Sequence, residues 1–549
     1  MKKLILFFGL LMGSAACFAE LKVADVFSDH MVLQREKPVP VWGTADAGAT
    51  VTIEFAGQKK TAVADSSNHW KLFLDPMPAS SKPWRMTVSS TLNSELETLN
   101  FADVLIGEVW LCSGQSNMGF PVSRALNAGE EVRAADYPEI RLLMVEQRLD
   151  CAPRDYCEIW GDAWVPCSPD VIERFTAVGY FFGRELYEEL DIPIGLIESA
   201  WGGSRIEAWT DWGLTQNDPV ARSILSPWKG MIDKTPDYFE DFAAYAKSFD
   251  ERVRAVGAQK KEWEIRKKEA IKNRQRFKEP QPKADPLLTP GNKHTPASIY
   301  NAMIVPLAPY ALRGAIWYQG ESNAKAPITY RSQLPLLIQN WRDLWEDQDL
   351  AFYVVQLANL GPLQKNPVEA SAGFADLRDA QRFVVQNDPH MALATAVDIG
   401  EAGDIHPKNK QEVGRRLALP ALNRLYGKSC EDSGPVFETL EQNGGLLVLT
   451  FSHARGLQAK DGCALKGFAV RSEKGEWVWA DSKIDGCRIE LSAEGVAAPV
   501  AARYSWARNP IGNLVNSAGL PAIPFRSDAQ HSATERVDLE KIHAYKGNK

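Results

Sequence analysis

Apolar and polar positions alternate with period two over much of the first hundred residues. The alternation is clearest at 51–55, 70–74 and 84–88, and turns rich in Gly, Pro, Asn and Asp separate these runs. Short alternating runs at this spacing predict a β-sandwich. Residues 20–100 are therefore expected to form a small β-sandwich domain, which either binds sugar or braces its neighbour.

The middle of the chain changes to longer apolar runs that alternate with helical periodicity. Strands are predicted at 104–112, 193–199, 313–318, 351–357 and 391–397, and helices near 175–190, 330–345, 374–387 and 408–426. Such alternation indicates βαβ units, with a parallel sheet and helices on both of its faces. We assign residues 101–427 to this α/β domain.

A helical insertion is predicted at about 212–295 within the α/β domain. Its apolar positions at helical spacing are Phe239, Phe242, Tyr245, Phe249, Val253 and Val256. A charged run at 260–278 and a proline-rich return at 279–290 follow. Acidic residues interrupt the basic ones, which favours a solvated helix face over a nucleic-acid site. The insertion could also wall the active site.

Residues 428–549 are again rich in predicted strands. Runs at 446–451 and 488–491 are strand candidates, and 473–476 is a hairpin turn between 468–471 and 477–479. The last twenty or so residues are expected to form a loose tail.

Composition and the N-terminus narrow the class of protein. A chain of 549 residues is too long to fold around a single hydrophobic core, so more than one domain is expected. A net charge of −8 without a basic patch argues against nucleic acid or an anionic membrane as partner. Lys2, Lys3, an apolar run at 4–12 and a cleavage site before Glu20 predict a signal peptide at 1–19. The protein is expected to be periplasmic or secreted, without a membrane span; a lipid anchor at Cys17 is the alternative. The oligomeric state is left open.

Cysteine usage in an exported chain allows disulfides. The candidates are Cys463 with Cys487 and one pair among Cys151, Cys157 and Cys167, whereas Cys112 lies in a predicted strand and is expected to be a buried free thiol. No Cys/His spacing indicates zinc, and no metal site is expected.

The most informative turn follows the strand predicted at 104–112. Ser116 lies there between Gly114 and Asn117. In open α/β sheets ligands bind beyond the carboxyl ends of the strands, so Ser116 is placed to act as a nucleophile. Taken alone, such a turn is more often structural.

Three other predicted strands end in comparable polar turns. These turns are 199–204, 319–323 and 398–407. The carboxyl ends of parallel strands share one edge of a sheet, so the four turns are expected to converge.

Together the turns supply what ester hydrolysis requires. Ser116 needs a base, and His406 is the best candidate because an imidazole titrates near neutral pH. A carboxylate must orient the imidazole; Asp404 is nearest in sequence, and Asp398 and Glu401 are rivals.

An oxyanion hole and substrate contacts are predicted from the same turns. The backbone N–H groups of Ser116 and Gly202 and the side-chain amide of Asn323 could hold the oxyanion. Gln115, Gln319 and Glu321 are expected to bind the substrate.

These blocks resemble the SGNH (GDSL-like) hydrolase superfamily, and within it the sialate O-acetylesterase family. The matching motifs are Gly-Gln-Ser116-Asn, Gly202-Gly-Ser204, Trp-Tyr-Gln-Gly-Glu-Ser-Asn323, Asp404-Ile-His406-Pro, Phe27-Ser-Asp-His-Met-Val-Leu-Gln34 and Tyr504-Ser-Trp-Ala-Arg-Asn-Pro510. The resemblance extends over about 26–528. It implies a flavodoxin-like SGNH fold and metal-free removal of acetyl groups from sugars, through an acyl-serine and without a cofactor.

Two departures from these patterns bear on the mechanism. Gly403 stands where the superfamily usually has its acid, three residues before the histidine, so a Ser–His pair oriented by a backbone carbonyl is an alternative to the three carboxylates. Met118 replaces the last glycine of the Gly-x-Ser-x-Gly elbow, which argues against a lipase of the α/β-hydrolase fold.

The sequence thus predicts an exported carbohydrate O-acetylesterase. Its substrate would be acetylated sialic acid or an acetylated plant polysaccharide such as xylan. Arg124, Arg205 and Lys325 lie near the motifs, and none of them decides between these sugars. A protein of another class, a catalytically inactive carbohydrate-binding or scaffold protein on the same fold, is the alternative.

Overall fold

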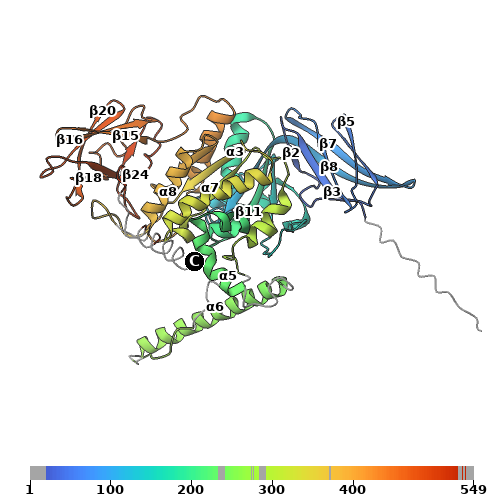
Figure 1. Ribbon diagram of the computed structural model, residues 1–549, viewed down its shortest axis with the longest axis horizontal. Helices are drawn as coiled ribbons and strands as arrows, with labels where there is room; N and C mark the ends of the chain where they lie inside the picture. Colours follow the sequence, from blue (N-terminus) through green and yellow to red (C-terminus); the bar gives the residue numbers. More distant parts are fainter. Residues whose placement is uncertain are drawn as a thin grey trace, which may run out of the picture.

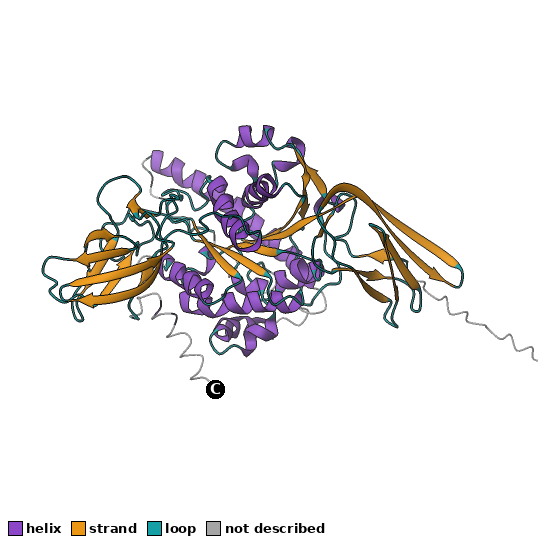
Figure 2. Ribbon diagram, turned by 90° about the horizontal axis from the view of Figure 1, so that it is seen from above, coloured by secondary structure: helices purple, strands orange, loops and turns teal. Residues whose placement is uncertain are grey.

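The computed structural model describes residues 20–232, 242–273, 275, 277–282, 292–369, 373–529, 535 and 538. The predicted signal peptide with Cys17, Phe239 and most of the predicted tail lie outside the described residues. The described part is a mixed α/β structure, with one large mixed sheet and further antiparallel sheets (Figures 1 and 2).

The N-terminal strands form two antiparallel groups around a shared core. The first contains β1 (Lys22–Val23), β3 (Val39–Thr44) and β6 (His69–Leu74); the second contains β4 (Thr50–Phe55), β5 (Gln58–Val63) and β7 (Ser80–Leu92). Alternate residues of β4 and β6 point into the core, for example Val51, Ile53, Trp70 and Leu72. Burial on one face explains the period-two pattern of the sequence.

Strand β8 (Glu95–Gly114) joins the N-terminal strands to the central sheet. Its first half pairs with β7 antiparallel, and its second half lies between two parallel neighbours. The short β2 (Val32–Gln34) pairs with it in parallel. The domain boundary predicted at residue 100 therefore falls inside one continuous strand.

The central sheet is parallel except at one edge. Its order is β10 (Val165–Cys167), β9 (Tyr137–Met144), β11 (Ile194–Ala200), β8, β12 (Gly314–Tyr318), β13 (Ala351–Gln356) and β14 (Met391–Thr395), and only β10 is antiparallel to its neighbour. Five of these strands match the strands predicted from sequence.

Helices cover both faces of this sheet. Successive residues of β8 enter different cores: Trp110 packs with α3 (Ala177–Leu190) and α9 (Lys410–Pro420), and Leu111 packs with α7 (Pro327–Leu344) and α8 (Phe374–Gln386). A strand buried on both faces must be apolar throughout, which explains the continuous run at 104–112.

Four further α-helices of the described part are short: α1 (Ala128–Arg133), α2 (Pro169–Ile172), α4 (Trp212–Asn217) and α5 (Leu225–Ile232). Helix α6 (Phe242–Lys272) occupies the predicted insertion and runs clear of the central sheet (Figure 1). The returning chain lies along it, because Trp263 Nε1 donates to the Glu279 carbonyl at 3.0 Å.

The C-terminal region contains antiparallel sheets around a separate core. One sheet has the order β15 (Val436–Asn443), β16 (Leu446–Ser452), β21 (Arg488–Ser492) and β20 (Asp481–Asp485); another has the order β19 (Val478–Trp479), β18 (Phe468–Arg471), β22 (Ala501–Tyr504) and β24 (Phe525–Arg526). The pair β17 (Gln458–Ala459) and β23 (Leu514–Val515) completes the region. Strands β18 and β19 flank the predicted hairpin turn.

None of the candidate disulfides is present among the described residues. The free thiols are Cys112, Cys151, Cys157, Cys167, Cys430, Cys463 and Cys487. The Cys167 thiol points to the Ala135 carbonyl at 3.7 Å, while Cys463 and Cys487 are exposed. Cys112 is buried in β8, as expected. Among the described helices, none combines the length and apolarity that crossing a bilayer requires.

Candidate active site

The last residues of β8, β11 and β12 are in register, so the turns that follow these strands begin side by side. Gly114 is in register with Ala200 on one side and with Tyr318 on the other. Gly114 has a φ of +141°, and a Cβ there would lie 2.2 Å from the Tyr318 carbonyl oxygen. Only glycine allows this approach, which brings the turn of Ser116 against the turn that follows β12.

Ser116 and His406 are in direct contact. His406 Nε2 lies 2.8 Å from Ser116 Oγ, although the two residues are 290 positions apart in the chain. The imidazole packs almost parallel to the Phe120 ring, with centroids 6.3 Å apart. Burial lowers the pKa of His406 and nearby Asp404 opposes that shift, so the ring is a neutral acceptor at neutral pH.

Asp404 is the carboxylate that faces the imidazole. Its Oδ1 lies 3.6 Å from His406 Nδ1 and accepts the His406 backbone N–H at 2.9 Å, and this hydrogen bond lowers the pKa of Asp404. The distance of 3.6 Å is too long for a hydrogen bond and becomes an ion pair only when the ring is protonated.

The two rival carboxylates have other partners. Asp398 pairs with Arg416 at 2.6 and 3.1 Å and with Lys460 at 3.0 Å. Glu401 Oε1 accepts the Lys408 backbone N–H at 2.9 Å.

Gly202 and Asn323 lie in the turns that follow β11 and β12. A Cβ on Gly202 would lie 3.3 Å from Ser116 Cβ, so the Gly202 backbone packs directly on the serine. The Asn323 Oδ1 accepts from the Ile206 backbone and from Gln319 Nε2, and its Nδ2 donates to Glu207 at 3.0 Å. These bonds fix the orientation of the amide and use one of its two N–H groups.

Gln115, Gln319 and Glu321 bond to protein groups in this structure. Gln115 Oε1 accepts the backbone N–H groups of Gly320 and Ser322, both at 3.4 Å. Gln319 is fully buried and donates to the Ser204 carbonyl as well as to Asn323. All three tie neighbouring turns together, and their contact with substrate stays a prediction.

A buried lysine that the sequence did not single out, Lys410, bonds to the turn of Ser116. Lys410 Nζ donates to Asn117 Oδ1 at 2.6 Å, and Asn117 Nδ2 donates to Glu321 Oε1 at 2.6 Å and to the Ile405 carbonyl at 3.0 Å. Burial lowers the pKa of Lys410 to about 7 and raises that of Glu321. Asn117 therefore joins the serine turn, the Glu321 turn and the His406 loop. The available signal was spacing: Lys410 follows His406 by four residues and begins α9.

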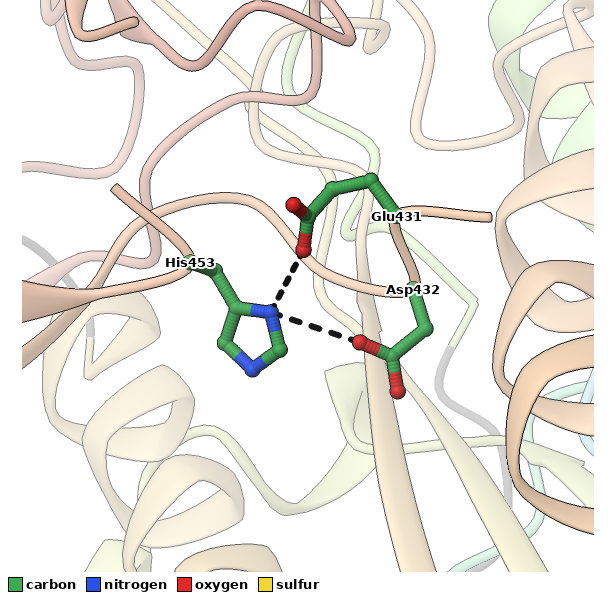
Figure 3. Close-up of side chains that lie close together, drawn as sticks. All are labelled: Glu431, Asp432 and His453. Atoms are coloured by element: carbon green, nitrogen blue, oxygen red, sulfur yellow. Dashed lines mark hydrogen bonds and ion pairs between the residues drawn. The ribbon is translucent and has the colours of Figure 1, made fainter. Parts of the chain in front are cut away.

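A second group of ionisable side chains lies near the start of β14, at the other end of the strands from Ser116. His453 Nδ1 is 2.6 Å from Glu431 Oε1 and 3.3 Å from Asp432 Oδ1 (Figure 3). Asp432 also pairs with Arg424, which donates to the carbonyl of Met391, the first residue of β14. The group thus fastens the C-terminal strands to the central sheet through the hydrogen bond of His453 and the ion pair of Arg424 with Asp432.

Comparison with known proteins identifies the family. The sequence model of a carbohydrate esterase family, described as sialic acid-specific acetylesterase, matches residues 106–234 and 292–423. The sialate O-acetylesterase of Mus musculus is 30% identical over 93% of this chain and 95% of its own length; that of Homo sapiens is 30% identical over 92% of each. The chain belongs to this family. The resemblance inferred from the motifs is confirmed.

The overall structure agrees with the family. A carbohydrate acetylesterase from Xanthomonas citri has a TM-score of 0.74 and 32% sequence identity, over 93% of this chain and 100% of that one. Our protein is thus a carbohydrate O-acetylesterase, which implies an acetylated carbohydrate as substrate. The family match stops at 234 and resumes at 292, and α6 lies in that interval.

Proposed function

We propose that this family member is a serine esterase in which Ser116 is the nucleophile and His406 the base. The 2.8 Å contact between Ser116 Oγ and His406 Nε2 carries the proposal. Ser116 Oγ attacks the acetyl carbonyl carbon while its proton passes to His406 Nε2. The ester C–O bond then breaks, and the sugar oxygen takes that proton. His406 then takes a proton from water, which attacks the acetyl carbon of the acetyl-serine. The bond between that carbon and Ser116 Oγ breaks, His406 returns the proton to Ser116 Oγ, and acetate is released.

The surrounding groups support both steps. The Ser116 and Gly202 N–H groups and the second N–H of Asn323 would hold the oxyanion, and loss of one such donor typically costs roughly 10²–10³ in rate. Asp404 would orient His406 and stabilise the imidazolium. An inactive scaffold would have no need of the Ser116–His406 contact.

We further propose that the central domain is a flavodoxin-like SGNH domain and that the N-terminal strands form a β-sandwich. The order β11-β8-β12-β13-β14 is 2-1-3-4-5 in chain order, which is the flavodoxin pattern. Export by the predicted signal peptide, to the periplasm or beyond the cell, is part of the proposal.

The sugar is proposed to be acetylated sialic acid, by analogy with the named relatives, with acetylated xylan as the competing substrate. Arg124 supports an acidic sugar, because its guanidinium lies 4.9 Å from the centroid of the Phe120 ring, which stacks on His406.

The test is hydrolysis of p-nitrophenyl acetate by wild type, Ser116→Ala and a control, Ser123→Ala, which changes an exposed serine nearby. Ser116→Ala should lose at least about 10³-fold in kcat, and the control nothing. Equal rates for Ser116→Ala and wild type would refute the nucleophile. Acetate release from O-acetyl sialic acid and from acetylated xylan then separates the two substrates.

A further inference from the structure

The motif 504–510 belongs to the C-terminal region. Its first residue, Tyr504, pairs within that region, whereas residues 506–509 contact the central domain. Arg378 of α8 is fully buried and donates to the carbonyls of Ala507 and Arg508, at 2.8 and 3.0 Å. It also donates to the carbonyls of Leu357 and Ala358, at 2.7 and 2.8 Å. One guanidinium thus fastens the loop after β22 to the segment after β13.

Two asparagines extend this junction toward the catalytic loop. Asn509 Nδ2 donates to the Gly361 carbonyl at 2.6 Å, and Asn359 Nδ2 donates to Asn509 Oδ1 at 2.8 Å. Asn359 Oδ1 in turn accepts the Gly400 backbone N–H at 2.5 Å. Asn509 is only 5% exposed, and all three bonds are partly buried.

The last bond reaches the segment that carries Asp404 and His406. A Cβ on Gly400 would lie 2.1 Å from the Asn359 carbonyl oxygen, so the two backbones touch. The Gly361 N–H donates to the Ala402 carbonyl at 3.0 Å, and residues 401 and 404 form a bridge two residues before His406.

We propose that Asn509 is a positioning residue for the esterase reaction: the C-terminal region holds the His406 loop in register with Ser116 through Asn359. The inference rests on the proposed role of His406 as base. Asn509 touches neither the substrate nor the reacting atoms. It acts by fixing where the imidazole stands, and misplacement by about 1 Å can cost 10²-fold in rate.

The test compares Asn509→Ala with the matched control Asn513→Ala. Asn513 lies four residues further on and makes its side-chain bonds only within the C-terminal region, to Asp461, Ala464 and Lys466. With p-nitrophenyl acetate, Asn509→Ala should lower kcat by about 10- to 100-fold and leave KM within about 2-fold. Asn513→Ala should change neither.

The pH profile separates positioning from a merely structural role. Burial is the largest cause of the lowered pKa of His406, so a loosened, more hydrated loop should move the acid limb of kcat/KM to higher pH. Asn359→Ala, which breaks the same chain without altering the C-terminal region, should reproduce both effects. The double variant should then be no worse than the more affected single variant.

Three results would overturn the inference. They are a wild-type kcat in folded Asn509→Ala, an unshifted acid limb in both variants, or additive losses in the double variant. If Asn509→Ala does not fold, Asn359→Ala decides by the same two measurements. Full activity of Ser116→Ala would instead overturn the proposed mechanism, whatever the Asn509 variants show.

Discussion

Asp404 is an exposed partner for half-buried His406, the proposed base. Its side chain is 45% exposed and that of His406 31%, and the carboxylate lies at ion-pair distance from the ring. Water screens such a contact, so Asp404 should contribute less than a buried triad acid. We expect Asp404→Asn to lower kcat by about 10- to 100-fold, at or below the low end of the roughly 10²–10⁴-fold that acid–base catalysis supplies.

The role of Asp404 can also be tested by the pH dependence of kcat/KM. In the proposed mechanism activity requires neutral His406, so kcat/KM should fall as pH drops through the pKa of that group, which burial holds below 6.5. Asp404 raises the pKa of His406, and Asp404→Asn should therefore move the acid limb to lower pH. Glu401→Gln is the control, since glutamine can still accept from Lys408. A limb that moves for Glu401→Gln and not for Asp404→Asn would reverse the assignment.

At the scale of elements, the site is formed by several turns that lie side by side. Asn117 connects the turn of Ser116, the turn of Glu321 and the loop of His406 through hydrogen bonds. Asn117→Ala removes the bonds to Lys410, Glu321 and the Ile405 carbonyl together. It leaves a buried ammonium and a buried carboxyl without their partner, at a cost of about 1–3 kcal/mol for each group. We expect a lower Tm and a kcat reduced by about 10-fold, with KM unchanged.

A matched asparagine controls for this loss. Asn387 is exposed, and its side chain donates only to the Phe383 carbonyl. Asn387→Ala should retain the wild-type Tm and kcat. Wild-type kinetics in Asn117→Ala would show that the turns hold their positions without it.

The sequence predicted the elements whose burial leaves a periodic trace. Strands buried on both faces, such as β8 and β12, are continuous apolar runs. Because the carboxyl ends of parallel strands lie at the same end of a sheet, the sequence also predicted that their turns lie close together. Strand β9 (Tyr137–Met144) was missed because Pro138, Glu139 and Arg141 break its pattern. The partners of Asn117 and Asn509 were missed for another reason: a polar side chain shows no sequence signal of which distant group it will bond.

At the scale of the whole molecule, three parts are joined without described cross-links. Strand β8 belongs to both the N-terminal strands and the central sheet, and Arg378 with the His453 group fastens the C-terminal region. Each junction is a buried strand, a hydrogen-bond set or an ion pair. Stability should therefore be independent of the redox state of the solution.

This independence can be measured directly. A Cys463–Cys487 disulfide would stabilise the fold by about 3 kcal/mol through loop closure, so its reduction would lower Tm visibly. We expect the same Tm with and without dithiothreitol. After unfolding without reductant, a chain that begins at Glu20 should titrate seven thiols, one for each free cysteine. Five thiols, together with a Tm that falls on reduction, would show that one disulfide pair forms in solution.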